Sequence, residues 1–472
     1  MNTKEEMRLL EEALEKIIAK AKEFGLDFYD TYFEICPSDV IYTFGAYGMP
    51  TRYSHWTFGK AYHKMKTQYD YNLGRIYEMV INSNPCYAFL LEGNSLIQNK
   101  LVMAHVLAHC DFFKNNAYFK GTSRDMVETM AAAAERFRDY EFKYGRLKVE
   151  AFIDAAISIQ ENIEPRPLPK PKNKDKGKRH GLQNRLDENP YDDLWSLDRK
   201  DEPEPDDAGQ VKRFPPEPEK DLMLFIIEHG KDLEDWQRDI MSVIRQEMIY
   251  FWPQMETKIM NEGWATYWHL RIIREMDLDE AEVVEFAKMH SGIIQTSRVR
   301  LNPYILGLKI FEDIEKRWDN PEPGEKMKYG RPGGEGREKI FEVRAAENDI
   351  SFIRNYLTRE LVEEMDIYIY KKTGNDWKIT EVEWEKVRDG LIKNLNNCGY
   401  PYIVVADGDF NKRGELYLKH VFEGTELDVY YLENTLPHVY TLWGRPVHLE
   451  TELNGKPVLF SYNGEKGSKK FL

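Results

Sequence analysis

Apolar residues recur at helical spacing along much of the chain. Between residues 4 and 24 they return every three or four positions, from Met7 to Ala21, and Gly25 follows where the pattern stops. This spacing predicts an amphipathic helix that ends at the glycine. The same pattern predicts further helices over residues 124–144, 147–163, 233–250, 251–276 and 280–289.

Alternating apolar and polar positions replace the helical pattern towards the end of the sequence. Segments such as YIVVADGD, GELYLKHVF and LDVYYLE alternate in this way and are predicted strands, mixed with helical stretches. We therefore expect a smaller C-terminal α+β domain over residues 341–472. A Gly-rich hinge at 325–340 precedes it, without the G-K-[ST] ending of a phosphate-binding P-loop.

Residues 164–220 interrupt the helical region. They combine closely spaced prolines with the charged runs KNKDKGKRH and DEPEPDD, and they hold few apolar residues. Such a composition is typical of disordered segments. The predicted fold is therefore mainly α: one large helical domain, formed by residues 1–163 and 221–324 around a disordered insert, followed by the α+β domain.

Composition and charge narrow the class of protein. The chain has 472 residues and a formal net charge of -15, which argues against general binding to nucleic acid or to anionic membranes. Four scattered cysteines without a C-x-x-C motif fit a reducing compartment. The N-terminus lacks the apolar core of a signal peptide, and no apolar run approaches the ~20 residues of a membrane span. We expect a soluble cytoplasmic protein.

The stretch LVMAHVLAHCDFFKNN, residues 101–116, is apolar on all sides for about three turns and predicts a buried helix. His105 and His109 lie four positions apart in it, so both imidazoles face the same way. A buried imidazole needs a partner for each ring nitrogen. A shared metal ion would satisfy this need, whereas two core histidines bonded to backbone or carboxylate oxygens remain the alternative.

A third ligand has to come from another helix. Glu262 in NEGWATYWH is the best candidate, because it is a carboxylate in an aromatic helix and Gly263 beside it permits close approach of another backbone. His269 lies two turns further along the same side. Its distance of ~10 Å along the helix axis predicts a contact with substrate rather than with the same ion.

Zinc peptidases of the H-E-x-x-H type use the glutamate of that motif as the general base. Here Val106 occupies its position and cannot move a proton. A hydrolytic site would therefore need another acid to activate water. Asp111, Glu92 and Glu228 are the candidates, and the sequence does not rank them.

Several long motifs resemble the stage V sporulation protein R (SpoVR) family. They are GMPTRYSHWTFGK, YEMVINSNPCYAFLLEGNS, MAHVLAHCDFFKNN, NEGWATYWH and RLNPYILGLKIFEDI. The resemblance extends over nearly the whole chain and implies a role in formation of the spore cortex, although relatives occur in non-sporulating bacteria. Genes of this family commonly neighbour those of an AAA+ serine kinase-like protein and a von Willebrand A-type protein, which implies possible protein partners.

A second, weaker resemblance concerns mechanism. The order H-x-x-x-H, E-G-W-A-x-Y and P-Y-x-x-G-x-x-I is similar to that of helical, gluzincin-type zinc peptidases. This resemblance implies that His105, His109 and Glu262 bind zinc and that Tyr304 and Gly307 line the substrate cleft. The absence of the motif's glutamate departs from that pattern and implies either altered hydrolytic chemistry or a metal site without catalysis.

Four further residues are candidate substrate contacts. His55 and His290 lie in or beside the motifs and would orient substrate, unless they make structural hydrogen bonds instead. Arg298 and Arg300 would clamp a carboxylate such as a peptide terminus, unless they are simply solvated.

Two main hypotheses follow from the sequence. The first is a metal-dependent hydrolase-like protein that uses zinc or another divalent metal and acts on a peptide or a cell-wall-related amide. The second is a non-catalytic regulatory or assembly factor in which the histidine helix is structural. A carboxylate-rich site for two metal ions, recruiting Glu128 or Glu150, is a third possibility.

Overall fold

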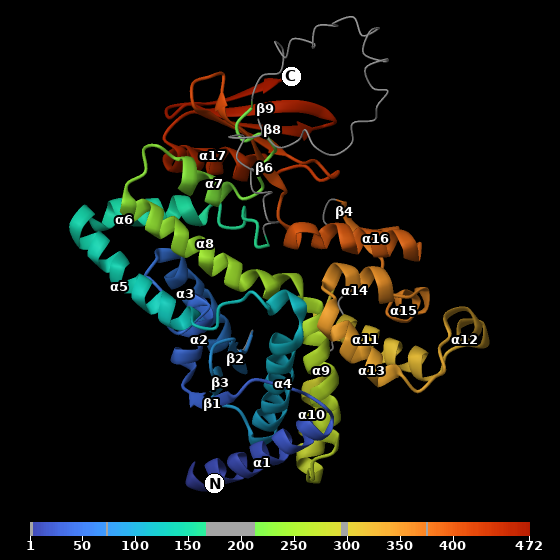
Figure 1. The fold of residues 1–472 in the computed structure, drawn as a ribbon. Helices are drawn as coiled ribbons and strands as arrows, with labels where there is room; N and C mark the ends of the chain where they lie inside the picture. The colour runs from blue at the N-terminus through green and yellow to red at the C-terminus, as the bar shows by residue number, and fades with distance from the viewer. Residues whose placement is uncertain (1–2, 72–73, 167–212, 294–300, 374–375) are drawn as a thin grey trace, which may run out of the picture. The chain divides into compact units, whose positions relative to one another are not determined.

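The computed structural model describes residues 3–71, 74–166, 213–293, 301–373 and 376–472 (Figure 1). The chain folds into two compact units, each made of two separate segments. The first unit comprises residues 1–161 and 232–402, and the second comprises residues 162–231 and 403–472. The predicted fold class is confirmed, because a large helical unit accompanies a smaller unit that holds a sheet.

Helices dominate the first unit. They are α1 (Thr3–Glu23), α2 (Ser38–Tyr47), α3 (Trp56–Asp70), α4 (Leu96–Asn115), α5 (Met126–Tyr144), α6 (Arg146–Ile157), α8 (Asp235–Glu256), α9 (Lys258–Arg274), α10 (Glu280–Ile293), α11 (Pro303–Asp319), α12 (Pro323–Tyr329), α13 (Gly336–Ala346), α14 (Asp349–Tyr356), α15 (Arg359–Glu364) and α16 (Trp384–Leu395).

Two small sheets accompany these helices. The first has the order β1-β3-β2, with β1 (Thr31–Cys36) parallel and β2 (Glu78–Ile81) antiparallel to the central β3 (Cys86–Leu91). The second is a hairpin of β4 (Ile369–Thr373) and β5 (Asp376–Glu381). The first sheet matters for function because β3 packs against α4 and so brings its neighbour β2 close to that helix.

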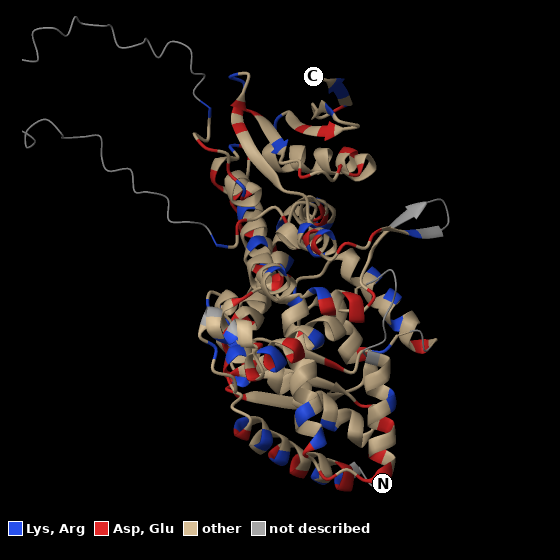
Figure 2. Cartoon of the chain, turned by 90° about the vertical axis from the view of Figure 1, so that its right-hand side faces the viewer, with Lys and Arg blue, Asp and Glu red and all other residues tan. Residues whose placement is uncertain are grey.

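The core of the first unit is built around α4. Every residue from Leu101 to Phe113 is buried, and α4 contacts α9, α1, α13 and β3. Helix α1 covers this core with its apolar face, since Leu10 and Ile17 are buried. The other face of α1 carries charges of both signs, as Figure 2 shows beside the N label. This division is what the hydrophobic pattern predicts for an amphipathic helix.

Among the residues that the structure describes, the second unit consists of a five-stranded sheet and two α-helices. Its strands lie in the order β10-β9-β8-β7-β6, and only β7 and β8 run parallel. The elements are α7 (Leu222–His229), β6 (Ile403–Phe410), β7 (Glu415–His420), α17 (Val429–Trp443), β8 (Val447–Leu453), β9 (Lys456–Tyr462) and β10 (Gly467–Phe471). Helix α7 joins this unit from far away in the sequence, and Phe225 of α7 stacks on Trp443.

The division between the units differs from the predicted domain boundaries. The α+β domain was expected to begin at residue 341, whereas the division lies at 402/403. The reason is packing: α13 contacts α11 and α4, and α14 contacts α9 and α16. Residues 162–231 belong to the second unit rather than to an insert and a helical domain. Most of the predicted insert, residues 167–212, lies outside the described residues.

Membrane association through a spanning helix was not expected from the sequence. In the part of the chain that the structure describes, no helix combines the length and the apolar character that crossing a bilayer requires.

Candidate metal centre

Helix α4 presents the two histidines from the interior. Its start is fixed by Ser95, whose side chain accepts from the backbone N–H of Gln98 while the Gln98 side chain accepts from the Ser95 N–H. This reciprocal capping box satisfies two backbone N–H groups at the start of α4. From that start, His105 and His109 lie on the same side, and their ring centroids are 4.5 Å apart.

Glu262 from α9 meets both histidines. Its Oε2 atom lies 3.6 Å from the Nε2 atom of His105 and 3.6 Å from the Nε2 atom of His109. The three potential ligand atoms lie within 4.8 Å of one another. Ligands that bind a tetrahedral zinc ion at ~2.0–2.1 Å are separated by about 3.4 Å. The residues present therefore fit a single ion of this size.

The other ring nitrogens of the histidines are held elsewhere. His109 Nδ1 lies 2.8 Å from the side-chain oxygen of Asn261, and His105 Nδ1 lies 2.9 Å from Nδ1 of His269. Metal-binding histidines usually donate their second ring N–H to such a partner, which fixes the tautomer. At His109 the oxygen of Asn261 accepts the Nδ1–H, which leaves the Nε2 lone pair free on the side of Glu262. His105 offers its Nε2 lone pair in the same way when its Nδ1 donates to Nδ1 of His269.

Electrostatics favour the metal-binding forms of these groups. Burial, reinforced by the charge of His105, lowers the pKa of His109 to about 4, so its imidazole is neutral at pH 7. Burial tends to raise the pKa of Glu262, but His105, His109 and Lys258 outweigh it and leave the pKa lowered. The Oε2 atom of this carboxylate is buried without a hydrogen-bond partner. A bound cation would compensate this atom.

A glycine pair positions Glu262. Helices α9 and α11 cross where Gly263 meets Gly307, and a Cβ atom on Gly263 would lie 2.4 Å from the Gly307 backbone. The close approach predicted for Gly263 is therefore confirmed. Gly307, which was expected to line the cleft, is buried in this crossing, and its lack of a side chain is explained by packing.

Tyr304 stands at the start of α11 beside the histidines. Its ring lies 6.2 Å from that of His105, at an interplanar angle of 23°. Burial and the nearby charges of Glu262 and Glu78 raise the pKa of its hydroxyl, which stays protonated and able to donate a hydrogen bond. The structure thus brings Tyr304 to the candidate ligands, in the region where the sequence placed it.

Glu78 is a further acid that the sequence motifs did not single out. It begins β2, opposite Leu90 of β3, and interacts electrostatically with His105, Glu262 and Tyr304. Burial, and then the charge of Glu262, raises the pKa of Glu78, although His105 opposes this shift. Glu78 lies within the YEMVIN stretch, but an acid at the edge of a short strand carries no periodic signal that marks it as functional.

Asp111 does not serve as the expected base. It lies about 200° around α4 from His109. Its carboxylate accepts hydrogen bonds from the Asp27 backbone N–H at 2.8 Å, the indole of Trp264 at 2.8 Å and the guanidinium of Arg344 at 2.9 Å. This network ties α4, α9 and α13 together, and the assignment of Asp111 is corrected to a structural one.

The other proposed acids lie away from the cluster. Glu92 is exposed just after β3, and Glu228 is exposed on α7 in the second unit. Glu128, considered for a second metal ion, is exposed on α5. Glu150 interacts electrostatically with His55, and neither residue belongs to the metal cluster. None of these positions supports a role in activating water at His105 and His109.

The remaining histidines have identifiable surroundings. His55 is buried, with Nε2 3.1 Å from Asp154 and Nδ1 2.7 Å from the hydroxyl of Thr57, which matches the structural alternative. His269 is fully buried and touches His105, so its predicted contact with substrate is replaced by a contact with a candidate ligand. The ring of His290 lies 6.1 Å from that of His269. Arg298 and Arg300 lie outside the described residues.

Comparison with known proteins identifies the family. A family model described as "SpoVR like protein" matches residues 4–400, and one described as "SpoVR-like C-terminal domain" matches residues 401–454. The change between them falls at the division between the two units.

One relative of this chain is a protein of Escherichia coli. The chain is 30% identical over 474 aligned residues to the uncharacterized protein YcgB of Escherichia coli (strain K12), covering 94% of this chain and 92% of that protein. No solved structure matches the chain significantly. The two family models together match residues 4–454, and the chain therefore belongs to the sporulation-associated SpoVR family.

Proposed function

We propose that this protein is a zinc-dependent hydrolase of a peptide or a cell-wall-related amide, and that it acts in formation of the spore cortex. One observation carries the proposal: the Nε2 atoms of His105 and His109 converge on the same oxygen of Glu262, while their Nδ1 atoms are held by other side chains. This is the donor set of catalytic zinc sites, with three protein ligands and an open fourth position.

Each residue of the proposed centre has a separate role in hydrolysis. Zinc held by His105, His109 and Glu262 would supply Lewis acidity and lower the pKa of bound water. Glu78 would accept the proton of the attacking water, the task that the missing glutamate of H-E-x-x-H would perform; its electrostatic interaction with His105 and Glu262 supports this role. The hydroxyl of Tyr304 would donate a hydrogen bond to the carbonyl oxygen of the substrate as charge develops on it; the stacking of its ring on His105 supports this role.

Metal content tests the binding of zinc. The purified chain is expected to hold about one zinc ion, and His105→Ala or Glu262→Ala is expected to lose it. His63→Ala and Glu92→Ala are matched controls, because both residues are exposed. A folded, zinc-free wild-type protein would contradict the proposal, as would a His105→Ala variant with its full zinc content.

Glu78→Gln tests catalysis separately. The variant is expected to keep zinc and to lose at least ~100-fold in the rate of amine release from peptides or cortex-type peptidoglycan fragments, since general-base catalysis contributes 10²–10⁴-fold. Unchanged hydrolysis would remove Glu78 from the mechanism. Loss of zinc in this variant would show that the carboxylate acts as a ligand.

A second candidate function follows from Val106. This residue is fully buried in the position of the usual base, as expected for a site that holds metal without catalysis. In that case the protein would be a regulatory or assembly factor. By family resemblance, its partners would be an AAA+ serine kinase-like protein and a von Willebrand A-type protein. Full support of sporulation by Glu78→Gln, together with failure of His105→Ala, would favour this role.

A further inference from the structure

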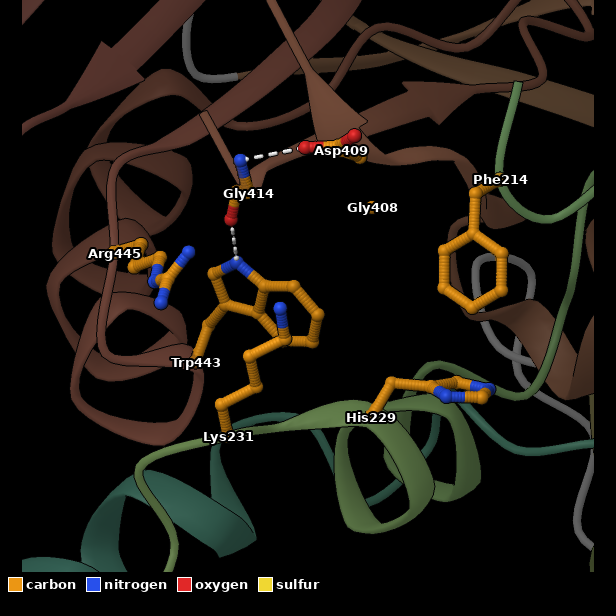
Figure 3. A pocket seen from close by; sticks show the side chains of 8 residues that line it. All are labelled: Phe214, His229, Lys231, Gly408, Asp409, Gly414, Trp443 and Arg445. Atoms are coloured by element: carbon orange, nitrogen blue, oxygen red, sulfur yellow. Dashed lines mark hydrogen bonds between the residues drawn. The ribbon is translucent and has the colours of Figure 1, made fainter. Parts of the chain in front are cut away.

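A cavity of about 370 Å³ lies within the second unit, on residues that the candidate metal centre does not use. Three segments that are distant in the sequence surround it. They are the stretch before and after α7, the turn between β6 and β7, and the end of α17. Figure 3 shows the lining residues, which are Phe214, His229, Lys231, Gly408, Asp409, Gly414, Trp443 and Arg445.

Hydrogen bonds to Gly414 hold the walls of this cavity in place. The Gly414 N–H donates to Asp409 at 2.8 Å, and the Gly414 carbonyl accepts from the indole of Trp443 at 2.8 Å (Figure 3). Gly414 has φ +69°, and a Cβ atom there would lie 2.2 Å from Nη1 of Arg445. The glycine therefore lets the guanidinium lie against the turn, where it also donates to the Arg413 carbonyl at 3.3 Å.

The lining is divided between flat apolar surfaces and charges. Phe214 and His229 are in edge-to-face contact with ring centroids 4.8 Å apart, and Trp443 forms another part of the wall. Lys231 and Arg445 supply two positive charges, and Asp409 supplies one negative charge. Together these three side chains leave one net positive charge on the lining. This charge balances a single carboxylate better than it balances a doubly charged phosphate.

We propose that this cavity binds a carboxylate joined to a flat apolar group, such as the C-terminal end of a peptide with an aromatic last residue. Arg445 and Lys231 receive the carboxylate, which accepts charge-assisted hydrogen bonds from both. The ring lies among Phe214, Trp443 and His229, where aromatic surfaces are available for contact. Ligand sites commonly combine apolar walls with a few fixed polar groups in this way.

Binding of two closely matched probes to the full-length protein tests the proposal by calorimetry. N-acetylphenylalanine, which carries the ring and the carboxylate, is expected to bind with a dissociation constant of about 1 mM or tighter. N-acetylphenylalanine amide has the same ring without the charge and is expected to bind at least ~10-fold more weakly, because it loses the charge-assisted hydrogen bonds. N-acetylalanine, which lacks the ring, is also expected to bind more weakly.

Variants locate the binding in this cavity. Lys231→Ala is expected to weaken N-acetylphenylalanine at least ~5-fold, whereas Lys456→Ala, another exposed lysine of the same unit, leaves it unchanged. Comparison with Ala-Ala-Phe distinguishes the source of the ligand: tighter binding of the peptide indicates a peptide end, and weaker binding indicates a small aromatic acid. Equal binding of acid and amide would overturn the proposal, as would tighter binding of phenyl phosphate or an unaffected Lys231→Ala.

Discussion

Single atoms decide what the candidate centre can bind. An imidazole offers a metal ion a lone pair on only one nitrogen when the other nitrogen carries the proton. At His109 that choice is made by Asn261, whose oxygen accepts from Nδ1 at 2.8 Å. Because Asn261 neighbours Glu262 on α9, the same helix supplies one ligand and orients another.

Asn261→Ala is therefore expected to weaken zinc binding by about 10–100-fold, the usual cost of removing such an orienting partner, while the fold is retained. The measurement is a competition titration against a zinc chelator. Asn355→Ala is the control, because Asn355 is exposed and makes a single surface hydrogen bond to Glu347. Equal zinc affinity in both variants would assign Asn261 to packing alone.

A site residue could be predicted from the sequence where it followed a periodic pattern or differed in chemistry from its neighbours. His105 and His109 were recognisable from helical spacing, and Glu262 stood out as a charge in an aromatic helix beside a glycine. Glu78 could not be found in this way, because only the pairing of β2 with β3 brings it to the site. Asp111 was misassigned because the sequence does not show that it points towards Arg344.

At the scale of elements, the crossing of α9 and α11 depends on two glycines, Gly263 and Gly307, which have no side chains. Cβ atoms cannot be accommodated there without separating the helices, since the clashes involve backbone atoms rather than flexible side chains. Sequence alone indicated the close approach at Gly263 but not its partner, Gly307. It also predicted a boundary between helices at residues 250 and 251, whereas α8 continues through Pro253 and the chain changes helix at Thr257.

Gly263→Ala is expected to lower the free energy of unfolding by about 2 kcal/mol or more, as overpacking does, and to reduce zinc content by displacing Glu262. Thermal unfolding and metal analysis measure the two effects. Gly59→Ala in α3 is the matched control: nothing lies within 4 Å of its Cβ position, so the change should stabilise by up to ~1 kcal/mol. A Gly263→Ala variant as stable as the wild type would contradict the described crossing.

The start of α9 is capped by an acid from another helix. Asp349 accepts from the backbone N–H groups of Ile259 and Met260 at 2.8 and 2.9 Å, and burial nevertheless raises its pKa to about 7. The unfolded chain gives up this proton near pH 4, whereas the folded chain keeps it until about pH 7. Folding is therefore favoured by the proton at low pH, and this contribution is lost as the pH rises from about 4 to 7.

Asp349→Asn cannot titrate. The free energy of unfolding of the wild type minus that of Asp349→Asn should accordingly fall between about pH 4 and pH 7, by at most ~4 kcal/mol, and stay constant above about pH 8. Urea unfolding of both proteins across this range measures the difference. A difference that is independent of pH would show that Asp349 has an ordinary pKa in the folded protein.

At the scale of the whole molecule, the chain leaves its first unit at residue 161 and returns to it at residue 232. The sequence showed a change of composition near residues 162–231 but did not show that these residues belong to the C-terminal unit. The link is made by Glu219, which pairs with Val405 of β6, and by Phe225, which meets Trp443. Such long-range pairings leave no periodic trace in either segment, so the boundary at 402/403 was not predicted.

A chain that ends at Tyr402 is expected to bind a hydrophobic dye and to aggregate. Without residues 403–472, α7 loses the partners of its buried residues, including Met223, Phe225 and Ile226. A chain that ends at the same residue and also lacks residues 162–231 should stay soluble and keep its zinc. Similar dye binding by both truncated chains would show that α7 does not depend on the second unit.

The pairing of β6 with the segment before α7 also sets an order of events during synthesis. About 180 residues separate Phe225 from Val405, so α7 leaves the ribosome on the order of ten seconds before its strand partners exist. During that interval the ribosome makes residues 232–402 of the first unit, while the apolar residues of α7 lack their partners in the second unit. The apolar residues of α7 therefore stay uncovered in the nascent chain until the strands of the second unit are made.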